Sequence, residues 1–309
     1  MPKKSLITML LLVLLVLPLS QPPPCYCGAL QVDGAFPGAN AWLSHQGFQV
    51  TGGPAGRDDL TAFSQGTIIF IGEAAGNPEH AQPAQREIMA KRAAVVMAQK
   101  QVVEYLYGFA INGERRVGDG QGAVASSVAG VVRRAQVAYQ EYSRENEKAI
   151  AILRIDLHGP GGFVSHLYEL LGKGDLAPGL DIGGQRFVSA SNLAEGIQYD
   201  GLIVDARDQE FRPAFLNRII ASSGDTLYDP TLVSQKVLVQ HGLAEYSTTV
   251  AKARAALETR GVLRPLLIRA TGTRQAVDIE VSADDAALIY SADQTAGFLA
   301  GAKVAFVLR

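Results

Sequence analysis

The stretch KAIAILRIDL, residues 148–157, decides the fold class. Its side chains alternate between two faces. One face carries Ala149, Ala151, Leu153, Ile155 and Leu157, and the other carries Lys148, Ile150, Ile152, Arg154 and Asp156. This period of two predicts a half-buried antiparallel strand. The residues 134–142 predict a partner strand, and the polar residues 143–147 between them predict the turn of a hairpin.

Upstream of the hairpin, the pattern alternates between strand and helix. Residues 67–72 (TIIFIG) are β-branched and aromatic, which predicts a strand. Residues 84–107 predict a helix that ends at Gly108, with an apolar stripe of Ile88, Val95, Val102 and Leu106. We expect a short strand at 109–117 and a second helix at 124–132. The order β-α-β-α-β-β predicts an α+β domain with helices on one side of an antiparallel sheet.

Downstream, residues 158–198 form a glycine-rich connection in which only 163–171 has helical character. The remaining residues predict a second α+β domain, again an antiparallel or mixed sheet with helices packed on it. Its expected strands are 202–204, 266–270, 278–281, a hairpin of 213–221 with 226–228, and an apolar, central closing strand at 304–308. Helices are expected at 248–258 and after Ser282, with Asp285 at the capping-box position.

The N-terminus has the features of a signal peptide. Lys3 and Lys4 precede an apolar run from Leu6 to Leu17, which is too short to span a membrane. We expect cleavage after Ala29, which would change the formal net charge from −2 to −2 − 2 = −4. A retained membrane anchor is one alternative, and lipid attachment at Cys25 or Cys27 is another. The mildly acidic remainder argues against a nucleic-acid partner.

The segment after the expected cleavage site is rich in glycine and alanine, and it contains the only tryptophan, Trp42, with Phe36 and Phe48. It is interpreted as an arm that either docks through these aromatic residues or acts as a mobile linker. The expected organisation is therefore a signal peptide at 1–29, a flexible arm at 30–66, domains at 67–158 and 199–309, and a linker at 159–198.

The sequence contains no strong catalytic motif. It has neither a nucleophile elbow, nor a phosphate-binding loop, nor a paired-histidine zinc motif. His158 precedes Gly-Pro-Gly-Gly, which could present backbone N–H groups to an oxyanion, but a strand-ending turn explains it more simply. We therefore expect no catalytic residues, no cofactor-binding residues and no metal ligands.

Weaker candidates lie at charged positions. Asp205, Arg207 and Asp208 follow a buried-type strand, where ligand sites of α/β proteins often lie, although a solvated Asp–Arg pair is the simpler interpretation. Asp284 and Asp285 fit the first turn of a helix. The basic pairs Arg115-Arg116 and Arg133-Arg134 could meet an acidic partner or lipid headgroups, but a solvated face explains them better.

Residues 67–157 resemble the Lpp-twenty lipoprotein family of bacterial envelope proteins, which is related to a domain of flagellar outer-membrane ring accessory proteins. The resemblance is carried by TIIFIGEA (67–74), KRAAVVMAQKQVVEYLYG (91–108), VVRRAQVAYQEY (131–142) and KAIAILRIDL (148–157). The tail, from YDGLIVDAR (199–207) through DIEVSADDAALI (278–289), looks like a domain found downstream in envelope proteins. The sequence departs from the family in lacking a good lipid-attachment box.

The resemblance implies a structural or adhesive role in the periplasm or at the outer membrane of a Gram-negative bacterium, and the family has no established enzymatic activity or cofactor to carry over. We therefore expect a non-enzymatic interaction protein, an accessory of a surface or flagellar assembly, with protein partners in the envelope. Outer-membrane association and homo-oligomer formation are left open. The alternative is a periplasmic enzyme or small-ligand-binding protein that uses the second domain near Asp205 and Arg207.

Overall fold

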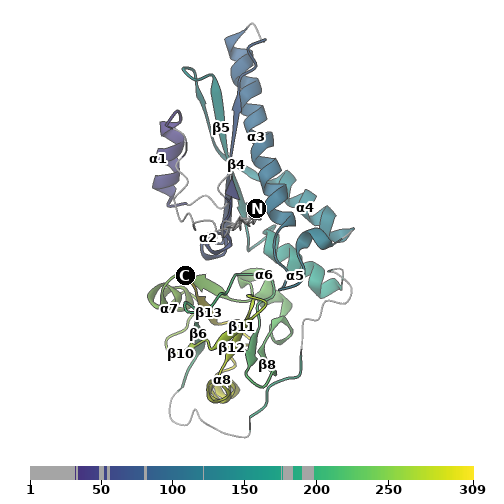
Figure 1. Ribbon diagram of the computed structural model, residues 1–309, viewed down its shortest axis with the longest axis vertical. Coiled ribbons are helices and arrows are strands. Elements are labelled where there is room, and N and C mark those ends of the chain that lie inside the picture. The colour runs from purple at the N-terminus through teal and green to yellow at the C-terminus, as the bar shows by residue number, and fades with distance from the viewer. Residues whose placement is uncertain are drawn as a thin grey trace, which may run out of the picture.

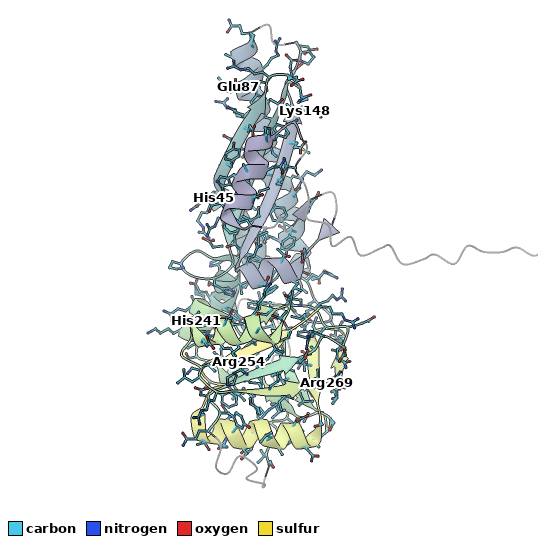
Figure 2. The ribbon with its side chains drawn as sticks, turned by 90° about the vertical axis from the view of Figure 1, so that its left-hand side faces the viewer. His45, Glu87, Lys148, His241, Arg254 and Arg269 are labelled. Carbon is cyan, nitrogen blue, oxygen red and sulfur yellow. The ribbon has the colours of Figure 1, made fainter. Side chains whose placement is uncertain are left out.

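The chain forms an α+β structure of two modules stacked along its long axis (Figure 1; Figure 2 shows the same arrangement after a turn of 90°). The computed structural model describes residues 32, 34–48, 52–53, 56–79, 82–120, 122–174, 176, 184–189 and 198–309. We call residues 32–158 the N-terminal module and residues 199–309 the C-terminal module. The expected signal peptide, with Cys25 and Cys27, lies outside the described residues.

The N-terminal module is built on a five-stranded sheet in the order β2-β1-β3-β5-β4. Its strands are β1 (Gly52–Gly53), β2 (Gly56–Arg57), β3 (Thr67–Ala75), β4 (Gln136–Ser143) and β5 (Lys148–Asp156). Both β3 and β4 pair antiparallel with β5, which confirms the predicted hairpin. β5 lies between its two partners and its apolar side chains are buried on both faces, not on one as the alternation had indicated.

The long helix α3 (Pro83–Tyr107) packs on one face of this sheet through its small residues. Ala94 and Ala98 are fully buried against β3, where Gly72 leaves room for the helix backbone. The predicted helix is confirmed, but the predicted apolar stripe is partly wrong. Ile88 is 52% exposed, because the row of Ala90, Ala94 and Ala98 faces the sheet and Ile88, two residues before Ala90, lies on the opposite side of the helix.

The other face of the sheet is covered by α1 (Pro37–Gln46), so the expectation of helices on one side only is wrong. Ile150 and Ile152 pack under Phe36 and Leu43 of this segment. Figure 1 shows α1 and α3 on opposite sides of the hairpin. This part of the predicted arm therefore docks on the sheet through its aromatic residues. Docking was one of the two expected alternatives, and a mobile linker was the other.

Polar and aromatic contacts fix α1 in place. The Glu141 carboxylate on β4 accepts a hydrogen bond of 2.8 Å from the Ala39 backbone N–H, in the first turn of α1. The Trp42 ring stacks on Tyr139 at 6.0 Å and also contacts Phe48. A carboxylate at the positive end of a helix is favourable, so Glu141 helps to hold α1 on the sheet.

Four short elements complete the N-terminal half. They are α2 (Asp59–Gln65), the 3-10 turn η1 (Val117–Asp119), α4 (Ala123–Arg134) and α5 (Phe163–Lys173). The expected strand at 109–117 is wrong, because this segment makes only an isolated bridge between Ala110 and Arg116. The carbonyls of Ala110 and Ile111 instead accept hydrogen bonds from the Phe215 and Leu216 N–H groups of the C-terminal module.

The C-terminal module contains two four-stranded sheets. The first, β10-β6-β13-β9, is entirely parallel, and the second, β11-β12-β7-β8, is mixed. The strands of the first are β6 (Gly201–Asp205), β9 (Glu245–Ser247), β10 (Pro265–Arg269) and β13 (Val304–Val307). Those of the second are β7 (Ile219–Ala221), β8 (Thr226–Tyr228), β11 (Gly272–Arg274) and β12 (Asp278–Val281).

The helices of this module are α6 (Gln235–His241), α7 (Val250–Glu258) and α8 (Ala283–Ala296), with the 3-10 turn η2 (Pro230–Leu232). α7 covers one face of the parallel sheet, where Ala253 and Leu257 pack on Ile203, Ala305 and Val307. The closing strand β13 lies inside the sheet, between β6 and β9, as its apolar sequence predicted. α6, β9 and β11 were not predicted.

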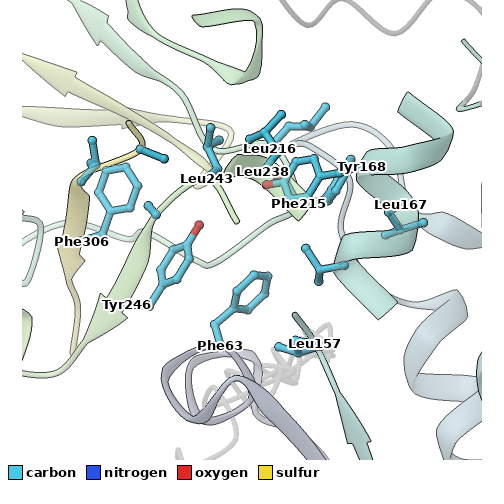
Figure 3. Close-up of a cluster of buried hydrophobic side chains, with 14 of the residues drawn as sticks. Phe63, Leu157, Leu167, Tyr168, Phe215, Leu216, Leu238, Leu243, Tyr246 and Phe306 are labelled. Carbon is cyan, nitrogen blue, oxygen red and sulfur yellow. The ribbon is translucent and has the colours of Figure 1, made fainter. Parts of the chain in front are cut away.

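The two modules share one apolar core. Phe63 of α2 contacts Tyr246 of β9, with 4.8 Å between the ring centroids, and Leu157 and Leu167 belong to the same buried cluster (Figure 3). α5 lies in the expected linker, yet six of its eleven residues are buried. This helix is therefore an integral part of the contact between the modules.

No helix in the described ranges is long and apolar enough to cross a lipid bilayer.

Candidate functional site

An open hollow of about 680 Å³ lies at one edge of the parallel sheet. Asp205 ends β6, Arg269 ends β10 and Arg309 follows β13. Because these three strands are parallel and adjacent, their carboxyl ends meet at this edge. Arg207 and Asp208 enter the hollow from the turn after β6. The structure thus brings together the three residues that the sequence singled out after this strand.

The charges in the hollow are engaged with one another. Arg207 donates to both oxygens of Asp205, at 2.9 Å from Nε and 2.6 Å from Nη2. Arg269 donates to Oδ2 of Asp208, at 3.1 Å from Nε. These hydrogen bonds hold the pKa of each carboxyl below its usual range. Such ionised carboxylates are weak proton acceptors at neutral pH, and none of the described residues that line the hollow is a histidine or carries a hydroxyl group.

The Asp205–Arg207 pair is solvent-exposed and should contribute little to stability. We expect Asp205→Asn to lower the free energy of unfolding by less than about 1 kcal/mol. The matched change is Asp278→Asn, because Asp278 is 3% exposed and accepts hydrogen bonds from the Arg218 side chain and backbone. Breaking that buried pair should cost about 3 kcal/mol. Urea unfolding of both variants measures how much free energy of unfolding each one loses. Equal losses would contradict the interpretation of Asp205–Arg207 as a weak surface pair.

The His158 segment forms a turn. Gly159 and Gly161 adopt left-handed φ values of +83° and +85°. The Gly162 N–H donates to the Gly159 carbonyl, and the Val164 and Ser165 N–H groups donate to the Leu157 carbonyl. These backbone donors are therefore used within the chain, which supports the turn interpretation over an oxyanion site.

The other charged pairs have structural roles. Asp285 lies in the first turn of α8, where its N–H donates to the Ser282 hydroxyl at 3.1 Å, which confirms the predicted cap. Arg133 and Arg134 are exposed in the last turn of α4. Arg116 donates to the Gly108 carbonyl at 2.8 Å, beside a small polar cleft that it lines with Arg115 between the modules.

Sequence reasoning missed several buried polar groups. Asn217 is fully buried, and Asp229 is a fully buried carboxylate that pairs with Arg186 at 3.1 Å. Arg186 lies in the expected linker, 43 residues from its partner. Such long-range pairs leave no local pattern in the sequence. Among the residues that the structure describes, histidines, aspartates and glutamates form no group of three or more that could hold a metal ion.

The helix α3 carries an unusual outward face. Met89, Val96 and Met97 are 42%, 61% and 43% exposed, and Ile88 lies beside them. At 3.6 residues per turn, Met89, Val96 and Tyr107 project away from the buried alanines. The exposed face of a surface helix is normally polar. Ile88 and Met97 are nine residues apart, so they lie on opposite edges of this side of the helix, and the exposed Lys100 and Glu104 lie between Val96 and Tyr107. The exposed side of α3 that carries Ile88, Met89, Val96, Met97 and Tyr107 is called the α3 face below.

Together, these features define an α+β protein of two closely joined modules, with a helix that exposes several large apolar side chains and a hollow whose two carboxylates are paired with arginines. Residues 201–309, about a third of the chain, match a family model described as "Treponema pallidum Tp0624, second domain". The C-terminal module is thus similar to that domain over the whole of its parallel and mixed sheets. The chain matches no curated protein.

Proposed function

We propose that this chain is a non-enzymatic structural or interaction protein of the cell envelope, exported to the periplasm or the outer-membrane periphery of a Gram-negative bacterium. The observation that carries this proposal is the α3 face. Five of the nine large hydrophobic side chains that are exposed among the described residues lie on this one helix. Met89 and Val96 lie two turns apart on the same side of α3. Exposed apolar side chains that lie together on a surface typically mark a site of protein contact.

Two sequence features support the location. The first is the expected signal peptide at residues 1–29. The second is the resemblance of residues 67–157 to the Lpp-twenty lipoprotein family, which also suggests a role as an accessory of a surface or flagellar assembly. The match of the C-terminal module to the Tp0624 second domain adds that this module resembles a domain of another bacterial protein.

The alternative of an enzyme or small-ligand binder has less support. The hollow at Asp205 is wide open, and its carboxylates are already paired with arginines. Small-molecule sites are usually concave and largely apolar, with a few free polar groups. The exposed apolar side chains of the α3 face therefore support a protein-contact role more strongly than the hollow supports an enzyme or a ligand binder.

Site-specific photo-crosslinking tests the proposal. The full chain would be expressed in a Gram-negative host with a photoreactive phenylalanine analogue at Val96, at the centre of the α3 face. The matched control carries it at Leu263, which is 80% exposed in the C-terminal module. We expect the chain in the envelope fractions, with a crosslinked partner from position 96 and none from position 263.

Two results would count against this function. One is recovery of the chain in the cytoplasm. The other is an exported chain whose Val96 position gives no more crosslinking than its Leu263 position.

A further inference from the structure

His158 lies at the corner where the two modules meet. It follows the last strand of the N-terminal sheet by two residues, and its ring packs on the backbone of Gly242, just after α6. A Cβ atom at Gly242 would lie 2.6 Å from the imidazole Cε1. Gly242 adopts a φ of +75°, so this tight approach depends on glycine. One histidine therefore fills the space between β5 and the α6–β9 turn.

The surroundings of His158 favour a neutral ring. Its Nδ1 atom is buried and has no hydrogen-bond partner among the described residues. The charged groups that act on it are Arg260, in the turn after α7, and His241, the last residue of α6. Glu245 of β9 is engaged with Arg260, whose Nη1 lies 3.4 Å from the carboxylate. A proton added to His158 would thus meet cationic neighbours in a place that excludes water.

We propose that His158 is an acid-sensitive latch between the modules: when its ring takes a second proton, the corner between β5 and the α6–β9 turn opens. The shared apolar core around Phe63 and Tyr246 keeps the modules joined. The opening is therefore local, and it exposes the backbone of residues 157–162 and 241–245.

The direction of the pH effect follows from burial. Burial, with smaller contributions from Arg260 and His241, lowers the pKa of His158 to about 4 from its usual 6.5. The closed corner therefore binds this proton more weakly than the open corner does. The latch is fully effective above pH 6.5 and weakens as the pH falls toward 4. From pH 7.5 to pH 5, the population of the open corner should rise about thirtyfold.

Two neighbouring groups adjust this effect. Burial also lowers the pKa of His241, so its protonation acts in the same direction as that of His158. Burial raises the pKa of Glu245, which means that the closed corner binds this proton more readily than the open one. Protonation of Glu245 therefore opposes opening and partly offsets the histidines.

Hydrogen exchange of the full chain, corrected for the intrinsic pH dependence of exchange, tests the latch. Between pH 7.5 and pH 5, we expect amides near residues 157–162 and 241–245 to lose at least tenfold protection. Amides in the centre of β3 and β13 should keep theirs. His158→Gln, which stays neutral at every pH, should remove most of this loss. The matched variant His241→Gln should remove little, because His241 is much less buried.

The proton can also be followed directly in the unchanged chain by the NMR titration of the His158 ring. A pKa of 6 or above would overturn the latch, as would uniform loss of protection throughout both modules. Loss of protection that His158→Gln leaves unchanged would overturn it as well.

Discussion

Replacement of Gly72 by alanine is expected to destabilise the N-terminal module by about 3 kcal/mol or more. A Cβ atom at this position would lie 2.1 Å from the Ala94 carbonyl oxygen and 2.4 Å from the Ala98 nitrogen. Both atoms belong to the backbone of α3, so no side-chain rotation can relieve the clash. The helix would have to move away from β3 along the whole row of buried alanines.

Gly130 provides the matched control for this substitution. It lies within α4, and a Cβ atom there would meet nothing within 4 Å. Gly130→Ala should therefore leave stability unchanged or raise it by about 1 kcal/mol, because alanine favours helix. Thermal and urea unfolding of the two variants compare the same added methyl group. A Gly72→Ala chain as stable as the Gly130→Ala chain would show that α3 is not held closely on the sheet.

Asn217→Leu is expected to cost about 4 kcal/mol, because it leaves several buried polar groups without partners. The Asn217 side chain donates to the carbonyls of Arg212 and Val277. Its oxygen accepts from the Ala214 N–H at 2.9 Å and from the Tyr246 hydroxyl at 2.5 Å. One amide thus connects the approach to β7, the loop before β12 and strand β9.

Tyr246→Phe offers a graded comparison, since it removes only one of these four hydrogen bonds. We expect it to cost about 1 kcal/mol. Urea unfolding at neutral pH measures both changes. Losses of similar size would mean that the Asn217 amide does not act as the centre of this network.

Much of the N-terminal module is predictable from local patterns. The alternation in residues 148–157 and the helical pattern ending at Gly108 correspond to β5 and α3. The α1 helix was missed because its residues lack a clear apolar period, and its order depends on contacts with β4 about a hundred residues away. The two-sided burial of β5 follows from α1, although the uninterrupted apolar run of residues 149–153 in the strand already indicated it.

The C-terminal module was less predictable because its strands are only three to five residues long. Strands this short give the class α+β but carry no signal for parallel pairing. The grouping of Asp205, Arg207 and Asp208 was foreseeable, since the residues are adjacent in sequence. The approach of Arg269 and Arg309 to them depends on the sheet order, and the partners of Asn217 are up to 60 residues distant.

The core shared by the two modules limits how the gene could be divided. Phe63, which precedes the first long strand, packs on Tyr246, which comes from the region matched by the Tp0624 family model. A recombination event that transferred only residues 201–309 would leave the Tyr246 side of the core exposed to water. The recipient would need its own replacement for α2 and α5, because both helices contribute side chains to this core.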